Sequence, residues 1–171
     1  MLSLLASGIV LGYIKDQKQR KELIRESDRI WRSIDRNQLF HALNILKMKK
    51  LVRVVEMADN NRVSINNRGR IRARRYLLDS LEVKKTKKWD GKWRIVIFDV
   101  PESRKSVRDG LRYHLKRLGF SEFQKSVFAI PYPCEDEIVT LINLMGLKDY
   151  VRYLESSISY EADLKKEFKL R

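Results

Sequence analysis

The chain has 171 residues, with 37 lysines and arginines against 22 aspartates and glutamates, a formal net charge of +15 and a pI of about 10.0. This length suits one or two domains with modest hydrophobic cores. So basic a balance favours a polyanionic partner, with nucleic acid first. The single cysteine, Cys134, excludes an internal disulfide and a cysteine zinc cluster, and it fits a reducing, cytoplasmic location.

The positive charge is concentrated in the first half of the chain. Residues 1–88 contain 22 basic and 9 acidic side chains, a net of +13. Residues 89–171 contain 15 and 13, a net of +2. Charge that serves only solubility need not segregate in this way. We therefore expect the first half to contact nucleic acid.

An apolar segment, Leu2–Ile14, opens the chain without a charged residue. It is too short to span a bilayer. No basic residue precedes it, as would be expected in a signal peptide. We interpret it as a buried helix of the first domain and expect no membrane association.

The next strong signal is a helix start at Asp35. Asp35 is a good N-cap, and Gln38 follows three residues later, as in a capping box. Ile34 and Leu39 are spaced to form a hydrophobic staple across that cap. The pattern predicts a helix that begins near Arg36 and ends near Lys50.

A hairpin and a further helix follow. Residues 51–56 and 62–65 have strand character, and Asp59, Asn60 and Asn61 supply turn chemistry between them. Asn67 can cap a last helix rich in arginine. A helix followed directly by a hairpin predicts a winged helix-turn-helix over residues 1–80. The alternative is an unrelated small α+β domain with a solvated basic face.

The capped helix has one face suited to reading DNA. Its leucines fall on one side, whereas Asn37, His41, Asn44 and Met48 fall on the other. Asparagine can pair with adenine, histidine can bond a base edge, and phenylalanine can contact a thymine methyl group. Arginine at a hairpin tip can enter the minor groove, and arginines of the last helix can contact phosphate. The expected DNA-binding residues are Arg36, Asn37, Phe40, His41, Asn44, Lys47, Arg62, Arg68 and Arg70. The alternative is a polar solvent-facing surface.

The second half of the chain reads as a β-α-β-β-α-β order. Residues 81–92 are lysine-rich and read as a basic linker. Residues 93–171 then follow the pattern of a ferredoxin-like α+β domain, which gives the whole chain an α+β fold class. The predicted elements are strand 93–98, helix 103–118, strands 120–123 and 126–130, a helix from 135 to Gly146, strand 150–157 and a tail at 161–171 that either docks or is exchanged with a partner.

An acidic residue ends the first of these strands. Ile95, Val96, Ile97 and Phe98 are consecutive apolar residues, which predicts a strand buried on both faces. Asp99 follows, and Pro101 then prevents further ladder pairing. A carboxylate in this position can hold a divalent cation or cap the turn that follows. Capping is the interpretation we favour.

These motifs resemble two related families. The runs IVIFDVP and QKSVF, with a basic helix containing Arg104 and Arg108 between them, resemble the ferredoxin-like domain of CRISPR-adaptation endonucleases, the Cas-two family. The preceding KWDGKW and the N-terminal half resemble PaaX-like (phenylacetate-repressor) transcription regulators, which carry a Cas-two-like domain behind a winged helix. Those repressors continue into a further C-terminal domain, which this sequence does not include up to Arg171. The resemblance is most specific over residues 89–132.

The resemblance to PaaX-like regulators implies a sequence-specific, double-stranded DNA-binding repressor that forms a homodimer through its ferredoxin-like domain and requires no cofactor. The resemblance to the nucleases implies an alternative, an endonuclease that binds Mg or Mn at Asp99 across a dimer axis and cleaves RNA or DNA. A third possibility is a DNA clamp that assists an adaptation integrase. The sequence leaves open the operator, any effector and the regulated genes.

Overall fold

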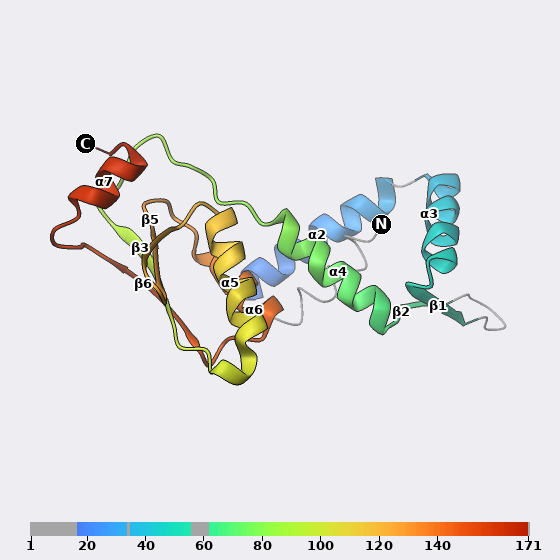
Figure 1. The fold of residues 1–171 in the computed structure, drawn as a ribbon. Coiled ribbons are helices and arrows are strands. Elements are labelled where there is room, and N and C mark those ends of the chain that lie inside the picture. The colour runs from blue at the N-terminus through green and yellow to red at the C-terminus, as the bar shows by residue number, and fades with distance from the viewer. Residues whose placement is uncertain (1–16, 34, 56–61, 171) are drawn as a thin grey trace. The chain divides into compact units, whose positions relative to one another are not determined.

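A computed structural model describes residues 17–33, 35–55 and 62–170 (Figure 1). The chain divides into two compact units, residues 1–80 and residues 81–171. The expected helix at Leu2–Ile14, the staple residue Ile34 and the hairpin turn at residues 59–61 lie outside the described residues. None of the described helices is both long and apolar enough to cross a membrane.

The first unit contains helices followed by a hairpin and one more helix. Its described elements are α2 (Gln17–Ser33), α3 (Arg36–Met48), β1 (Val52–Val55), β2 (Arg62–Ile65) and α4 (Asn67–Ser80). The predicted helix start is confirmed, because the Asp35 carboxylate accepts hydrogen bonds from the backbone N–H groups of Asn37 at 2.8 Å and Gln38 at 3.1 Å. These bonds satisfy two of the donors that a helix start leaves unpaired.

A small apolar core joins α3 to the hairpin. β1 and β2 pair antiparallel, with Val52 opposite Ile65 and Val54 opposite Val63. Leu46 at the end of α3 packs with Leu51 and Val52, and the half-buried Val63 covers them. The side chains of β1 alternate between the two faces of the hairpin, so Arg53 lies on the face away from this core.

The corner between α3 and β1 is fixed by the start of α4. The Asn66 side-chain amide donates to the Lys50 carbonyl at 2.9 Å, and the Asn66 side-chain oxygen accepts from the Gly69 N–H at 2.9 Å. The cap of α4 is therefore Asn66, and the expectation of Asn67 is wrong by one residue. A Cβ atom on Gly69 would lie 2.0 Å from the Leu51 carbonyl oxygen, so only glycine allows this approach.

The second unit is an α+β sandwich. Its elements are β3 (Trp93–Phe98), a 3-10 turn η1 (Glu102–Arg104), α5 (Lys105–Arg117), β4 (Ser121–Gln124), β5 (Val127–Ile130), α6 (Glu135–Met145), β6 (Val151–Ser156) and α7 (Ala162–Phe168). The strands form one antiparallel sheet in the order β4-β5-β3-β6. This is the arrangement of a β-α-β-β-α-β ferredoxin-like domain, as predicted.

The two faces of this sheet are covered differently. Helices α5 and α6 lie beside one face (Figure 1), and Glu122 of β4 makes ion pairs with Arg112 and Lys116 of α5. On the opposite face, Leu164 of α7 packs against Trp93, Ile95 and Ala129. The tail therefore docks on the sheet of its own chain. Part of the predicted linker also belongs to this unit, because Trp89 packs against the same cluster.

Replacing Gly69 with alanine should destabilise the first unit by about 1–3 kcal/mol, because the added methyl group forces α4 away from a backbone carbonyl. Urea unfolding followed by circular dichroism measures this change. Gly110→Ala in α5 is the matched control, since the nearest atom to its Cβ would be a flexible Met145 methyl group at 3.4 Å. The control should be neutral or stabilising by up to about 1 kcal/mol. Equal effects of the two substitutions would contradict this account of the corner.

Candidate nucleic-acid interface and strand-end pocket

The face of α3 opposite its leucines is open to solvent. Leu46 is buried, and Leu39 and Leu43 are half-buried. Phe40 is 63% exposed and Met48 is 82% exposed. The remaining predicted residues of the helix with described side chains are also exposed, namely Asn37, His41, Asn44 and Lys47. The exposed face of α3 thus presents amide, imidazole, aromatic and ammonium groups together.

The other predicted DNA-binding residues are Arg36 at the start of α3, Arg62 at the start of β2, and Arg68 and Arg70 of α4. The side chains of Arg36 and Arg62 lie outside the described part of the structure. Arg68 and Arg70, at the start of α4, line an open pocket of about 480 Å³ with Arg53 and Ser64 from the hairpin. Among the described residues, none of those that line this pocket belongs to α3. Arg53 was not among the residues that the sequence predicted to bind DNA. Its place between Val52 and Val54 in a half-buried strand nevertheless indicates an outward-facing side chain.

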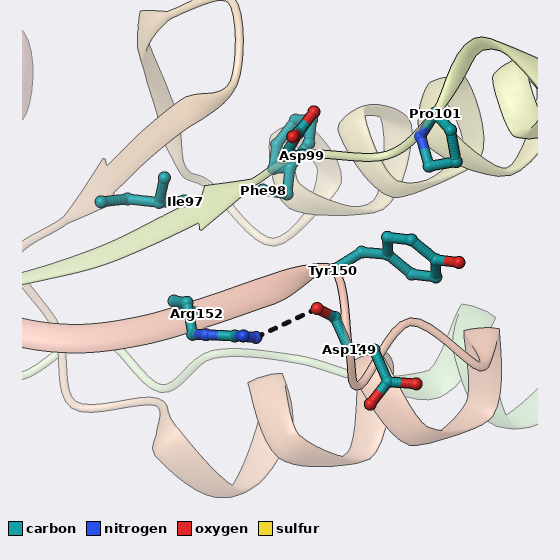
Figure 2. A pocket seen from close by; sticks show the side chains of 7 residues that line it. All are labelled: Ile97, Phe98, Asp99, Pro101, Asp149, Tyr150 and Arg152. Atoms are coloured by element: carbon teal, nitrogen blue, oxygen red, sulfur yellow. Dashed lines mark hydrogen bonds between the residues drawn. The ribbon is translucent and has the colours of Figure 1, made fainter.

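Asp99 lines a pocket at the end of β3 (Figure 2). The pocket has a volume of about 530 Å³, and Asp149, Tyr150 and Arg152 lie on its other side. The Asp99 N–H donates to the Tyr150 carbonyl at 2.9 Å, which continues the pairing of β3 with β6. The Asp99 and Asp149 carboxylates point in different directions in Figure 2.

The expectation that Asp99 caps the following turn is wrong. Pro101 precedes η1, and no side chain caps it with a hydrogen bond. The Asp99 side chain is exposed. Among the described residues, no group of three or more histidine, cysteine or acidic side chains is placed to hold a metal ion. If Asp99 takes part in metal binding, further ligands must come from a second chain or from substrate oxygens.

The sheet face beside this pocket is only partly covered. Ile97 of β3 is 40% exposed, so the prediction that this strand is buried on both faces is wrong at that position. α7 covers Trp93 and Ile95, which precede Ile97 on the same face, and does not reach the end of the strand. Phe123 of β4 is also exposed to a similar extent, 39%.

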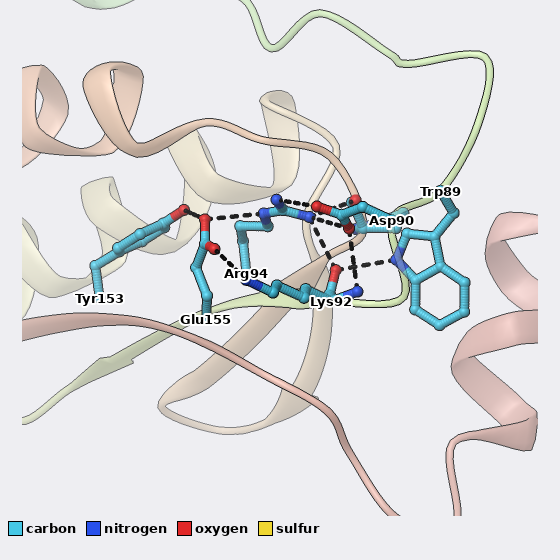
Figure 3. Close-up of polar contacts among 7 residues, drawn as sticks. Trp89, Asp90, Lys92, Arg94, Tyr153 and Glu155 are labelled. Carbon is cyan, nitrogen blue, oxygen red and sulfur yellow. Dashed lines mark hydrogen bonds and ion pairs between the residues drawn. The ribbon is translucent and has the colours of Figure 1, made fainter.

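The start of β3 is held by a buried arginine that the sequence interpretation missed (Figure 3). The Arg94 side chain is 4% exposed and makes a bidentate pair with Asp90, at 2.7 and 2.6 Å. Its Nε donates to Glu155 of β6 at 3.1 Å, and one terminal nitrogen also donates to the backbone carbonyls of Lys92 and Pro131. Three segments therefore meet at one guanidinium group: residues 90–94, Pro131 after β5, and β6.

One comparison with known proteins finds a family match over the second unit. Residues 86–167 match the family model described as the PaaX protein central Cas2-like domain. The second unit is therefore similar to the Cas2-like domain of PaaX proteins, and we call it the Cas2-like domain below. The match confirms the resemblance to the PaaX-like family that the motifs indicated. No functionally curated protein shows significant similarity to the chain.

Two protein chains among the solved structures match this chain significantly. One is the uncharacterized protein Rv0674 from Mycobacterium tuberculosis, with 21% sequence identity and a TM-score of 0.35. The similarity covers 79% of this chain and 53% of that protein, so this chain spans about half the length of that relative.

Cys134 packs inside the Cas2-like domain, at the start of α6. Burial, reinforced by the neighbouring Glu137 carboxylate, raises the pKa of its thiol to about 12. The thiolate is therefore scarce at neutral pH, which makes this cysteine a poor nucleophile.

The Asp90–Arg94 pair should make the Cas2-like domain sensitive to acid. The hydrogen bond from Arg94 lowers the pKa of Asp90 from 3.8 to about 2. A lowered carboxyl pKa gives stability that is complete above the ordinary value and is lost as the pH falls through the folded value. Asp90→Asn should destabilise the domain by about 1–2 kcal/mol at neutral pH, a figure reduced for the exposure of Asp90. The destabilisation should shrink between about pH 4 and pH 2.

Urea unfolding of the wild-type protein and of Asp90→Asn, at a series of pH values, measures the difference in their free energies of unfolding. Asp149→Asn is the control, because Asp149 is exposed and makes no ion pair among the described residues. A destabilisation by Asp90→Asn that remained constant down to pH 2 would show that the ionised pair is not its cause.

Proposed function

We propose that this protein is a double-stranded DNA-binding transcription regulator of the PaaX-like type, acting in the cytoplasm. The first unit is then a winged helix-turn-helix, with α3 as the recognition helix and the β1–β2 hairpin as the wing. The observation that carries the proposal is the exposed face of α3, which presents Asn37, His41 and Asn44 to solvent. This helix lies in the basic half of the chain, since residues 1–88 have a net charge of +13.

The composition of the α3 face suits the major groove. Asparagine can make two hydrogen bonds to the edge of adenine, and a base pair presents a distinct donor and acceptor pattern only on that side. Phe40 supplies an apolar surface for a thymine methyl group, and Lys47 supplies a cation for phosphate. Asp35 holds the helix start by its own side chain, so the face is formed before DNA binds.

The Cas2-like domain would pair two such units. Ile97 is an apolar side chain left uncovered on the sheet, and next to it the rim of the strand-end pocket carries Asp99, Asp149 and the exposed Arg152. In a two-fold interface each Arg152 can face an acid of the other copy, so this mixed rim suits a second copy of the chain.

Sedimentation velocity should show a dimer that Ile97→Asp converts to a monomer. A wild-type monomer at micromolar concentration would contradict this part of the proposal.

Asn44→Ala and Lys47→Ala should separate base reading from phosphate binding. Asn44→Ala should reduce the preference for a specific site, chosen by selection from a random duplex pool, over a mixed-sequence duplex. The reduction should be about 1–3 kcal/mol, because a base contact is lost. Lys47→Ala should weaken both complexes by similar factors, because a phosphate contact carries no sequence information. Fluorescence anisotropy with the two duplexes, at one salt concentration, measures both ratios.

If Asn44→Ala left the preference for the selected site unchanged, α3 would not read the DNA sequence through Asn44. If Lys47→Ala altered the preference as strongly as Asn44→Ala, the two proposed roles would not be distinct. Circular dichroism of both variants establishes that α3 remains folded.

A second candidate function is metal-dependent cleavage of RNA or DNA. One observation favours it. The Asp99 carboxylate is exposed at the edge of a pocket and caps no turn, so it is available to a divalent cation shared across a dimer axis.

Incubation of the purified protein with RNA and with duplex DNA, in Mg²⁺ or Mn²⁺, tests this function. Metal-dependent cleavage that Asp99→Asn abolishes and Asp109→Asn, at an exposed position of α5 outside the pocket, preserves would support it, because only Asp99 is proposed to bind the metal. Intact substrates under all of these conditions would exclude it. The chelator EDTA should stop any cleavage that depends on the metal.

A further inference from the structure

The pocket between the hairpin and α4 is lined mainly by side chains that can donate hydrogen bonds, with Ile65 as the apolar member. Arg53 and Ser64 lie directly opposite each other in the β1–β2 register, on the face away from the core. Arg68 and Arg70 come from the first turns of α4, and Asn67 lies beside them. Among the described residues, no acidic side chain lines this pocket of about 480 Å³. Three guanidinium groups therefore share one opening, and no described carboxylate neutralises them.

These arginines differ from others in the chain. Arg94 is buried in a network of acids and carbonyls, and Arg75 of α4 lies 4.0 Å from Asp79. Within the described residues, none of the three pocket arginines makes an ion pair with a carboxylate, and all three are exposed. Like charges held close together repel one another, and a bound anion relieves that repulsion.

Asn66 and Gly69 hold the backbone around the pocket in place. Asn66 lines the pocket and is held by bonds to the Lys50 carbonyl and the Gly69 N–H. Gly69 has no Cβ atom, so the start of α4 can lie close against the Leu51 carbonyl, and the two Asn66 hydrogen bonds hold it there. The stems of Arg53, Arg68 and Arg70 thus leave one rigid corner, and the positive end of the α4 dipole adds to their field.

We propose that this pocket binds a phosphate group of the DNA backbone, with Arg53 as its previously unassigned ligand beside Arg68 and Arg70. The inference rests on the proposed function, because it names the group on DNA that this corner holds. Guanidinium groups bind phosphate through paired N–H donors, and Ser64 and Asn67 add neutral donors. The pocket is open rather than enclosed, which suits a phosphate that belongs to a polymer. The contact carries no sequence information and fixes the position of the first unit on the duplex.

Two measurements on the full-length protein test the assignment. The first follows binding of a mixed-sequence duplex, about two helical turns long, at a series of salt concentrations. Arg53→Gln should lower the magnitude of the slope of log K against log salt by about 0.9, and Arg53→Gln with Arg68→Gln should lower it further. Arg75→Gln is the matched control on α4 and should change the slope less. Arg53→Lys should keep most of the slope, because the positive charge remains.

The second measurement is a titration with inorganic phosphate, followed by the arginine Nε–H signals in NMR spectra. Phosphate should shift the signal that Arg53→Gln removes, and should leave the Arg75 signal unchanged. Binding of duplex DNA with an unchanged slope in both Arg53→Gln and the double variant would overturn the pocket assignment while the proposed function stands. A phosphate-induced shift without any duplex binding would instead remove the DNA function and with it the backbone as the source of the phosphate.

Discussion

The close contact between Gly69 of α4 and the Leu51 carbonyl is the constraint on which the first unit depends. At this corner α3 ends, β1 begins and α4 starts, and Asn66 ties the three segments together with both ends of its amide. A longer side chain at position 69 cannot be accommodated without moving backbone. Because the corner is rigid, the exposed face of α3 and the arginine pocket of the hairpin keep a fixed geometry relative to each other. Such preorganisation reduces the entropy lost when a duplex binds.

A buried charge has the same organising role in the Cas2-like domain. The Arg94 guanidinium is almost fully removed from solvent. The free-energy cost of taking this charge out of water is offset because Asp90, Glu155 and two backbone carbonyls accept its hydrogen bonds. The KWDGKW segment is thereby fixed to β3 and β6, and Trp89 lies against the sheet face that α7 covers. The end of the same sheet that carries Ile97 and Asp99 remains open. The domain is therefore closed at one end of β3 and exposed at the other, where the proposed dimer contact lies.

Much of this architecture follows from local patterns in the sequence. Asp35 and Gln38 predicted the start of α3, and the spacing of Leu39, Leu43 and Leu46 predicted its inner side. The bounds of β3 and the end of α6 at Gly146 also agree with the sequence. These signals are local, because capping, helical periodicity and glycine conformation each involve residues close together in the chain.

The remaining features depend on contacts between distant residues. Arg94 reads as a surface cation in the sequence, and it is buried because the β3–β6 register places Glu155 directly opposite. The exposure of Ile97 follows from how far α7 reaches along the sheet. The role of Asp99 was assigned to a cap because a strand end followed by proline is a common turn signal, and only the tertiary structure shows a pocket there. Arg53 was overlooked because its significance comes from Arg68 and Arg70, which join it through the fold.

The central claim is that the basic first unit binds a DNA double helix and reads its sequence through α3. Selection of bound sequences from a random duplex pool by the purified protein, with cleavage products scored in the same tubes, tests it most directly. The account predicts an enriched motif of two symmetric half-sites recovered as intact duplex, as expected for a dimer of reading helices. Recovery of no enriched sequence, together with no retention of duplex even in dilute buffer, would contradict it.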